Sequence, residues 1–215
     1  QHEPAYRGIR EEHGRPEMYD TGLYERLQAF SLDDDGRQAA AELAYGELLL
    51  CGVTTLADLS SMSPWWLDLI ARSGLRGFIA PGFASSRWYM DSFHELKFNW
   101  NEQAGRKAFD EAAEFMTQAE AHPSKRLQGV VFPMQIDTCS EDLLRDCIAL
   151  AEETNRPITT HASQSQVEFL LMAKRHGVSP IKWASNIGLL GPRTTLGHAI
   201  FIDDHPSIDW RARED

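Results

Sequence analysis

Two histidines occupy equivalent places in the chain, each at the end of a short β-branched run. His161 closes the run 157–160 (Pro-Ile-Thr-Thr), and His198 closes the run 194–197 (Thr-Thr-Leu-Gly). The amphipathic segment 166–176 lies between them, so the pattern predicts strand, helix, strand. Ligands bind and catalytic groups collect at the carboxyl ends of parallel strands, and imidazole both binds transition metals and moves protons near neutral pH. The spacing therefore predicts half of an active site.

Two polar residues near strand ends are further candidates. Gln164 comes three residues after His161, close enough to face the same site. Its amide can orient a substrate by hydrogen bonds but cannot exchange protons as a carboxylate would. Asp58 ends another apolar run, where a carboxylate either joins the site or caps the following loop, and the sequence leaves both open. The remaining histidines fall in predicted loops or helix ends and are expected to be exposed and inert, namely His13, His94, His122, His176 and His205.

The surrounding elements alternate along the chain. Strands are predicted at 53–58, 75–80, 127–135, 157–161 and 194–198. Helices are predicted at 36–50, 65–72, 102–121, 141–154, 166–176 and 179–187. Alternation of this kind indicates parallel strands joined by right-handed crossovers. An open doubly wound sheet and a closed (β/α) barrel both fit, although no glycine-rich phosphate fingerprint follows any strand, which weighs against a dinucleotide-binding sheet.

Two segments are harder to interpret. The stretch 81–100 is rich in aromatic residues and is predicted as a long loop, whose rings either pack on the domain surface or form a pocket wall. Trp88 is the candidate substrate contact from this stretch. The helix 36–50 has Leu43, Glu47 and Leu50 on one side.

Composition limits the classes of function. A chain of 215 residues is expected to form one domain. A net charge of −11 argues against nucleic acid or an anionic membrane as a partner, and no apolar run approaches the roughly 20 residues of a membrane span. The three cysteines have no metal-type spacing, and the start of the chain has no signal-peptide core, so we expect reduced thiols and a cytoplasmic location.

Three segments together resemble the amidohydrolase superfamily, in particular its triazine hydrolases and nucleobase-type deaminases. They are 41–59 (AELAYGELLLCGVTTLADL), 139–170 (with the strand-end His161) and 177–205 (with the Gly-His pair at 197–198). The resemblance covers most of the chain from about Ala40 onward. It implies a (β/α)8 barrel with a divalent metal ion at its carboxyl face, zinc being favoured over iron.

The resemblance also assigns roles to individual residues. His161 matches the metal ligand that ends the fifth strand. His198 matches the sixth-strand histidine, which contacts the attacking water or the substrate, or is itself a ligand in members with two metal ions. The opening run 2–8 (His-Glu-Pro-Ala-Tyr-Arg-Gly) resembles the segment that follows the family's first-strand His-x-His pair, so His2 is predicted as a second metal ligand. Gln164 departs from the pattern, because that position usually carries a glutamate that shuttles protons.

These observations lead to a specific expectation. Residues 1–215 would form part of one barrel domain of a longer protein, with the first strand and the last two strands outside the chain. The activity would be metal-dependent hydrolysis of a C–N or related bond in a cyclic or amidine-like small molecule. His198 and Gln164 would be catalytic, His2 and His161 metal ligands, and Gln164 and Trp88 substrate contacts. A homodimer stays open, and the alternative is an inactive binding or scaffold protein of the same fold.

Overall fold

The computed structural model describes residues 3–8, 24, 31–91, 95–203 and 205–208. The helical elements are η1 (Glu3–Tyr6, a 3-10 helix), α2 (Asp34–Leu50), α3 (Trp66–Ser73), α4 (Glu102–Ala121), α5 (Glu141–Thr154), α6 (Gln166–His176) and α7 (Pro180–Asn186). The strands are β1 (Thr55–Ser60), β2 (Arg76–Phe83), β3 (Ser86–Tyr89), β4 (Lys97–Trp100), β5 (Leu127–Gly129), β6 (Phe132–Pro133), β7 (Ile158–Ala162) and β8 (Thr194–His198).

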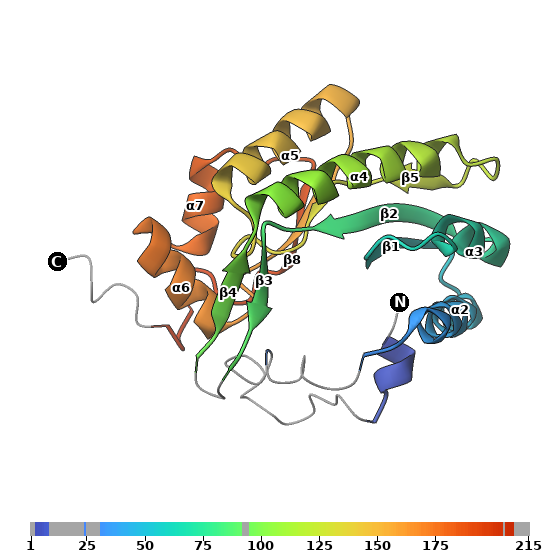
Figure 1. Cartoon of the computed structure of the whole chain (residues 1–215), viewed down its shortest axis with the longest axis horizontal. Coiled ribbons are helices and arrows are strands. Elements are labelled where there is room, and N and C mark those ends of the chain that lie inside the picture. Colours follow the sequence, from blue (N-terminus) through green and yellow to red (C-terminus); the bar gives the residue numbers. More distant parts are fainter. Residues whose placement is uncertain (1–2, 9–23, 25–30, 92–94, 204, 209–215) are drawn as a thin grey trace.

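The main strands are parallel, as their alternation with helices predicts. β2 pairs with β1, β5 and β6, and β7 pairs with β8, all in parallel. Isolated parallel bridges join Val131 to Ile158 and Gln135 to His161, which links the β5–β6 region to β7. Figure 1 shows these strands as a curved row with α4, α5 and α7 along its outer side. The protein is therefore of the α/β class, with the carboxyl ends of its parallel strands at a common edge.

Three helices begin where a serine can cap them. Ser140, Ser165 and Ser179 precede α5, α6 and α7, and each side chain accepts the backbone N–H of the residue three positions further on. Such bonds satisfy amide groups that the first helical turn leaves unpaired. Gly177 ends α6 in the left-handed conformation, with φ of 73°. The predicted bounds of α4, α5, α6 and β8 are confirmed.

The aromatic stretch 81–100 is not one long loop, and that expectation is wrong. Its first residues belong to β2, and the rest contains an antiparallel pair, β3 with β4, in which Trp88 is opposite Phe98 and Ser86 is opposite Trp100. The guanidinium carbon of Arg175, on α6, lies 5.1 Å from the ring centre of Phe98 and 5.2 Å from that of Trp100. Cross-strand aromatic pairs and this cation–π packing stabilise a hairpin where periodicity alone gave no signal.

One further expectation needs correction, and the structure defines the buried face of α2. The predicted strand 127–135 is divided into β5 and β6, which pair with successive parts of β2. In α2 the buried residues are Ala40, Ala41 and Tyr45, whereas Leu43 is 52% and Leu50 89% exposed. The small alanines allow close packing, and α2 contacts α3, so neighbouring elements decide which face is buried.

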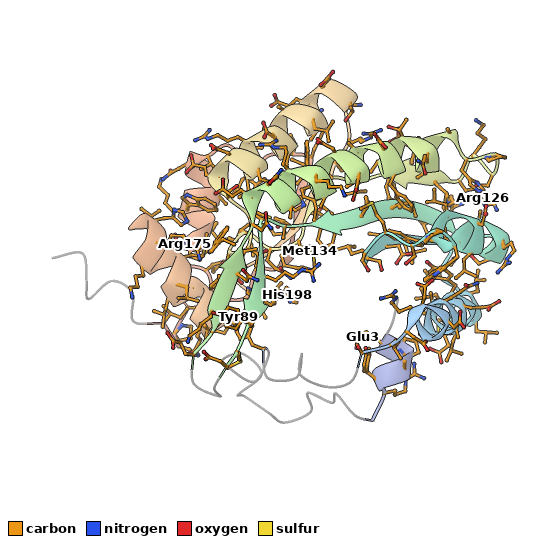
Figure 2. The ribbon with its side chains drawn as sticks, in the orientation of Figure 1. Glu3, Tyr89, Arg126, Met134, Arg175 and His198 are labelled. Atoms are coloured by element: carbon orange, nitrogen blue, oxygen red, sulfur yellow. The ribbon has the colours of Figure 1, made fainter. Side chains whose placement is uncertain are left out.

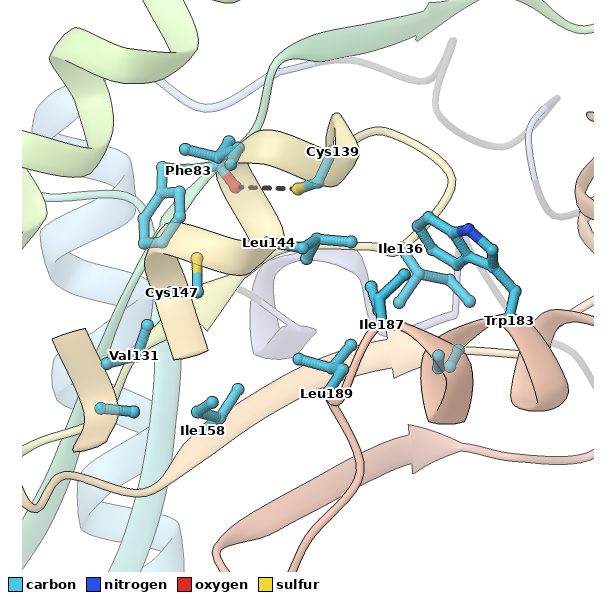
Figure 3. Close-up of a cluster of buried hydrophobic side chains, with 14 of the residues drawn as sticks. Phe83, Val131, Ile136, Cys139, Leu144, Cys147, Ile158, Trp183, Ile187 and Leu189 are labelled. Carbon is cyan, nitrogen blue, oxygen red and sulfur yellow. Dashed lines mark hydrogen bonds between the residues drawn. The ribbon is translucent and has the colours of Figure 1, made fainter. Parts of the chain in front are cut away.

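The core next to β7 fixes the position of that strand. Ile158 on β7 packs among buried side chains of α5 and of the segment around α7, including Leu144, Cys147, Trp183 and Leu189 (Figure 3). Each large apolar side chain buried in this way contributes about 1.5–3 kcal/mol. Burial raises the pKa of the Cys147 thiol well above its usual value, so this cysteine acts as an inert apolar residue.

Candidate active site

The pairing of β7 with β8 brings the two strand-end histidines together. The register places His161 opposite Gly197 and Ala162 opposite His198. The centres of the two imidazole rings are 5.0 Å apart, with 43° between the ring planes. Figure 2 shows His198 on the inner side of the curved row of strands. Two imidazoles therefore share one end of a parallel sheet, where ligand sites form in folds of this class.

Gly197 makes room for the His161 ring. A Cβ atom at position 197 would lie only 2.6 Å from His161 Nδ1 and 3.3 Å from its Cε1. The Nδ1 atom is itself buried and has no hydrogen-bond partner among the described residues. The ring of Phe132 packs edge-on against the imidazole, with 5.5 Å between centres. Packing by Phe132 and the space at Gly197 thus position this ring, and its Nδ1 is unsatisfied within the described part of the chain.

Burial also sets the charge of this ring. Desolvation, with a smaller contribution from the neighbouring His198, lowers the pKa of His161 to about 4. The imidazole is therefore neutral near pH 7, which is the form that donates a lone pair to a metal ion or accepts a proton.

Gln164 lies in the short connection between β7 and α6. The residue is 6% exposed, and its Nε2 group is buried without a partner among the described residues. Next to it, Ser163 has a left-handed backbone with φ of 54°, and its carbonyl accepts the N–H groups of Ile200 and Phe201, just after β8. The ends of β7 and β8 are therefore tied together directly beside the two histidines.

Trp88 is engaged by a carboxyl group that the sequence did not single out. Its Nε1–H donates to Asp137 Oδ2 at 2.8 Å, and the ring of Tyr24 packs edge-on against it at 4.8 Å. Asp137 is fully buried, and its Oδ1 has no partner among the described residues. Burial raises the pKa of Asp137 to about 6, although the Trp88 bond lowers it. The indole N–H is therefore occupied, which leaves only the ring surface of Trp88 for a substrate.

Asp58 is held by bonds to other elements, and His2 is not among the described residues. Asp58 is buried and accepts hydrogen bonds from the Tyr45 hydroxyl at 2.5 Å and from Trp66 Nε1 at 2.7 Å. These bonds link β1 to α2 and α3, a structural role that differs from the loop capping considered from the sequence. His2 lies outside the described residues, so its predicted role as a ligand stays a prediction. Among the residues that the structure describes, no three His, Cys, Asp or Glu side chains are grouped as a metal site requires.

Comparison with known proteins shows what the chain is similar to. No family model matches the chain. A 5'-deoxyadenosine deaminase of Methanothermobacter thermautotrophicus is 27% identical over 188 residues, which are 86% of this chain and 40% of the relative. A 5-methylthioadenosine/S-adenosylhomocysteine deaminase of Thermococcus kodakarensis is 28% identical over 166 residues, which are 77% of this chain and 36% of the relative. The chain is therefore similar to deaminases of adenosine derivatives, which agrees with the resemblance of its sequence to the amidohydrolase superfamily.

Solved structures agree at the level of the fold. A guanine deaminase from C. acetobutylicum gives a TM-score of 0.63 at 14% identity and covers 78% of this chain and 39% of its own. An adenosine deaminase from Xanthomonas campestris with bound zinc gives 0.61 at 16% identity, with 80% and 36% covered. An atrazine chlorohydrolase from Arthrobacter aurescens complexed with zinc gives 0.62 at 16% identity, with 85% and 41% covered. The resemblance seen in the sequence is thereby confirmed.

The similarity covers only part of each relative. The chain spans 36% to 40% of the length of the two curated relatives, and its fold corresponds to 36% to 41% of the three solved structures. Within the described residues, the structure contains no helix that is both long enough and apolar enough to cross a bilayer.

Proposed function

We propose that this chain carries part of the active site of a metal-dependent hydrolase that cleaves a C–N or related bond in a nitrogen-containing ring compound. The observation that carries the proposal is the pair of imidazoles, His161 and His198, 5.0 Å apart at the carboxyl ends of β7 and β8. The superfamily supports it, because the relatives are named as deaminases of adenosine derivatives. The inactive scaffold alternative gains no support from these relatives.

The donor set fits a divalent metal ion of the zinc type. His161 is neutral near pH 7 and has a buried ring nitrogen without a partner, and neutral imidazole is a preferred ligand of zinc and of iron. We propose His161 as a ligand, with His2 as a second one. Zinc is favoured, since two structures with this fold carry it. When bound, such an ion lowers the pKa of water towards neutral pH and so supplies a nucleophile.

The chain's own residues would orient the reactants and move protons. His198, exposed at the same strand edge, would accept the proton of the attacking water and return it to the leaving group. Gln164 would donate its unpartnered Nε2–H to an acceptor atom of the substrate ring, since an amide orients but does not exchange protons. The ring face of Trp88 would stack on a planar substrate.

The wider expectations stay part of this proposal. We propose that residues 1–215 form part of one (β/α)8 barrel domain, closed by strands beyond those described here. A cytoplasmic location and a homodimer are likewise predictions that no observation tests.

Metal content and activity of histidine variants test the proposal. His161→Ala should lose the metal, because a ligand is removed. His198→Ala should retain most of it while hydrolysis of adenosine, guanine and triazine compounds falls by roughly 10²–10⁴-fold, the usual range for a lost acid–base group. His122→Ala is the control, since this imidazole lies between α4 and β5, at the opposite end of the strands, and bonds to Ser124. A protein that is free of metal and inactive on every substrate of the panel would contradict the proposal.

A further inference from the structure

Glu168 is a fully buried carboxyl group close to the proposed site. The residue is on the first turn of α6 and is 0% exposed. Its Oε1 accepts the backbone N–H of Ser163 at 2.6 Å, and its Oε2 accepts that of Gln164 at 2.9 Å. Burial, together with the nearby Asp137 carboxylate, raises the pKa of Glu168 to about 8. Burying a carboxyl group costs free energy unless hydrogen bonds compensate for the lost water. The two bonds of Glu168 provide this compensation, and their partners show whether they do more than cap the helix.

Capping of α6 is already provided by another side chain. Ser165 Oγ accepts the N–H of Glu168 at 3.0 Å, which is the first half of a Ser-x-x-Glu capping box. In the usual box the glutamate returns to the backbone N–H of the capping residue itself. Here the carboxyl reaches one and two residues further back, to Gln164 and Ser163. The group therefore holds the connection that leaves β7, in addition to the end of the helix.

The connection between β7 and α6 has a backbone that requires stabilisation by hydrogen bonds. Ser163 has φ of 54°, a left-handed backbone conformation that is unfavourable for residues other than glycine. Its carbonyl also accepts two N–H groups from the segment after His198. Gln164, the next residue, has a buried Nε2 group without a partner among the described residues. A buried donor without an acceptor is unfavourable. If the backbone of Gln164 could move, its Nε2 group would therefore rotate to bond with another acceptor.

We propose that Glu168 is a positioning residue of the proposed active site. Its carboxyl group fixes the backbone of Ser163 and Gln164, and thereby keeps the Gln164 amide at the end of β7, where His161 stands. The inference rests on the proposed function for its catalytic consequence, because it gives Gln164 a fixed direction for binding the substrate. The geometric part, that Glu168 orders this backbone, stands independently of any activity.

A double-mutant cycle separates positioning from general stability. Above pH 8, where the Glu168 carboxyl is ionised and both its oxygens accept, the new amide N–H of Glu168→Gln faces one of the two backbone N–H donors, so one bond is lost. We expect kcat of the metal-loaded protein to fall by about 10–100-fold with KM changed less than about threefold, the scale of a displacement near 1 Å. In a Gln164→Ala background the same substitution should change kcat by less than about threefold, because its effect passes through Gln164. If Glu168→Gln does not fold, Glu168→Asp takes its place.

The control is a carboxylate with a similar bond pattern away from the site. Glu120 accepts the backbone N–H of Gly129 at 3.2 Å and pairs with Arg156. Glu120→Gln should lower the free energy of unfolding without a change in kcat beyond about twofold. Additive effects of the Glu168 and Gln164 substitutions would overturn the proposal.

Hydrogen exchange supplies a second readout that does not depend on turnover. The amides of Ser163 and Gln164 should exchange at least about tenfold faster in Glu168→Gln, while amides of α4 keep their rates. Unchanged exchange at these two amides would refute the positioning role even in an active enzyme. If the wild-type protein shows no turnover, the proposed function is wrong. The hydrogen-exchange rates of Ser163 and Gln164 then test the positioning role of Glu168 without any activity measurement.

Discussion

Gly197 offers the sharpest test of how the His161 ring is held. In Gly197→Ala the added Cβ would lie 2.6 Å from His161 Nδ1, whereas ordinary contact begins at 3.4 Å. The imidazole must therefore retreat by about 0.8 Å, the difference between these two distances. The backbone of Gly197 is not in the left-handed region, so strain in the main chain does not contribute. The perturbation is a displacement of one ring.

The expected change in the free energy of unfolding follows from two opposing effects. Overpacking of this kind costs about 1–3 kcal/mol, and replacing glycine by alanine returns about 0.4–1 kcal/mol by restricting the unfolded chain. The free energy of unfolding should therefore fall by about 1 kcal/mol. A shift near 1 Å in a catalytic group costs about 10²-fold in rate, so activity should fall much more than stability. Metal affinity should fall too, if His161 is a ligand.

The assays are urea unfolding, metal content after dialysis and initial rates on the substrate panel. Gly191→Ala is the matched control, because it lies just before the same strand and a Cβ there would meet nothing within 4 Å. This variant should match the wild type in metal content and rate, and its free energy of unfolding should rise by about 0.4–1 kcal/mol. If Gly197→Ala also keeps wild-type metal content and rate, the position of His161 does not matter for the site, and the reasoning is refuted.

Two further predictions concern buried polar groups. Gln164→Glu should leave metal content unchanged and alter the pH–rate profile or substrate preference, because it introduces an exchangeable proton; an unchanged profile and preference would exclude Gln164 from the site. Asp137→Asn should flatten the pH dependence of stability. The pKa of Asp137 is raised from 3.8 to about 6 in the folded chain, so its protonated form stabilises the fold fully below pH 3.8 and this contribution is lost as the pH rises through 6. Urea unfolding between pH 4 and 7 measures this slope, and an equal slope in both proteins would contradict the assigned pKa.

Local patterns predicted the elements that carry the site. The helix at 166–176 and the strand at 194–198 have the same bounds in sequence and structure, because a capping serine, a closing glycine and β-branched runs are all local signals. The pairing of His161 with Gly197 could not be predicted in this way. Register depends on how two distant strands pack, and only the folded chain shows why position 197 has no side chain.

The face of α2 shows where periodicity fails. Leu43 and Leu50 follow a helical spacing, yet the helix buries Ala41 and Tyr45 instead. The reason is the Tyr45 hydroxyl, which reaches Asp58 at 2.5 Å and draws that side of the helix against β1. A specific polar bond between elements thus outweighed the hydrophobic pattern within one of them.

The same reasoning explains why the buried carboxyl groups were missed. Asp137 and Glu168 are charged residues by type, and such residues are expected at the surface unless a partner is visible. For Glu168 a local signal existed, the Ser165-x-x-Glu168 capping box, but its displaced bonds depend on the turn at Ser163. For Asp137 none existed, because its partner Trp88 comes from the β3–β4 hairpin, 49 residues earlier. That hairpin is itself anchored by Arg175, which donates to the Asp137 carbonyl at 2.8 Å and packs on the hairpin's aromatic rings. The partner of Asp137 is therefore supplied by a distant part of the chain, whereas Glu168 bonds to the backbone of its own neighbours in sequence, Ser163 and Gln164.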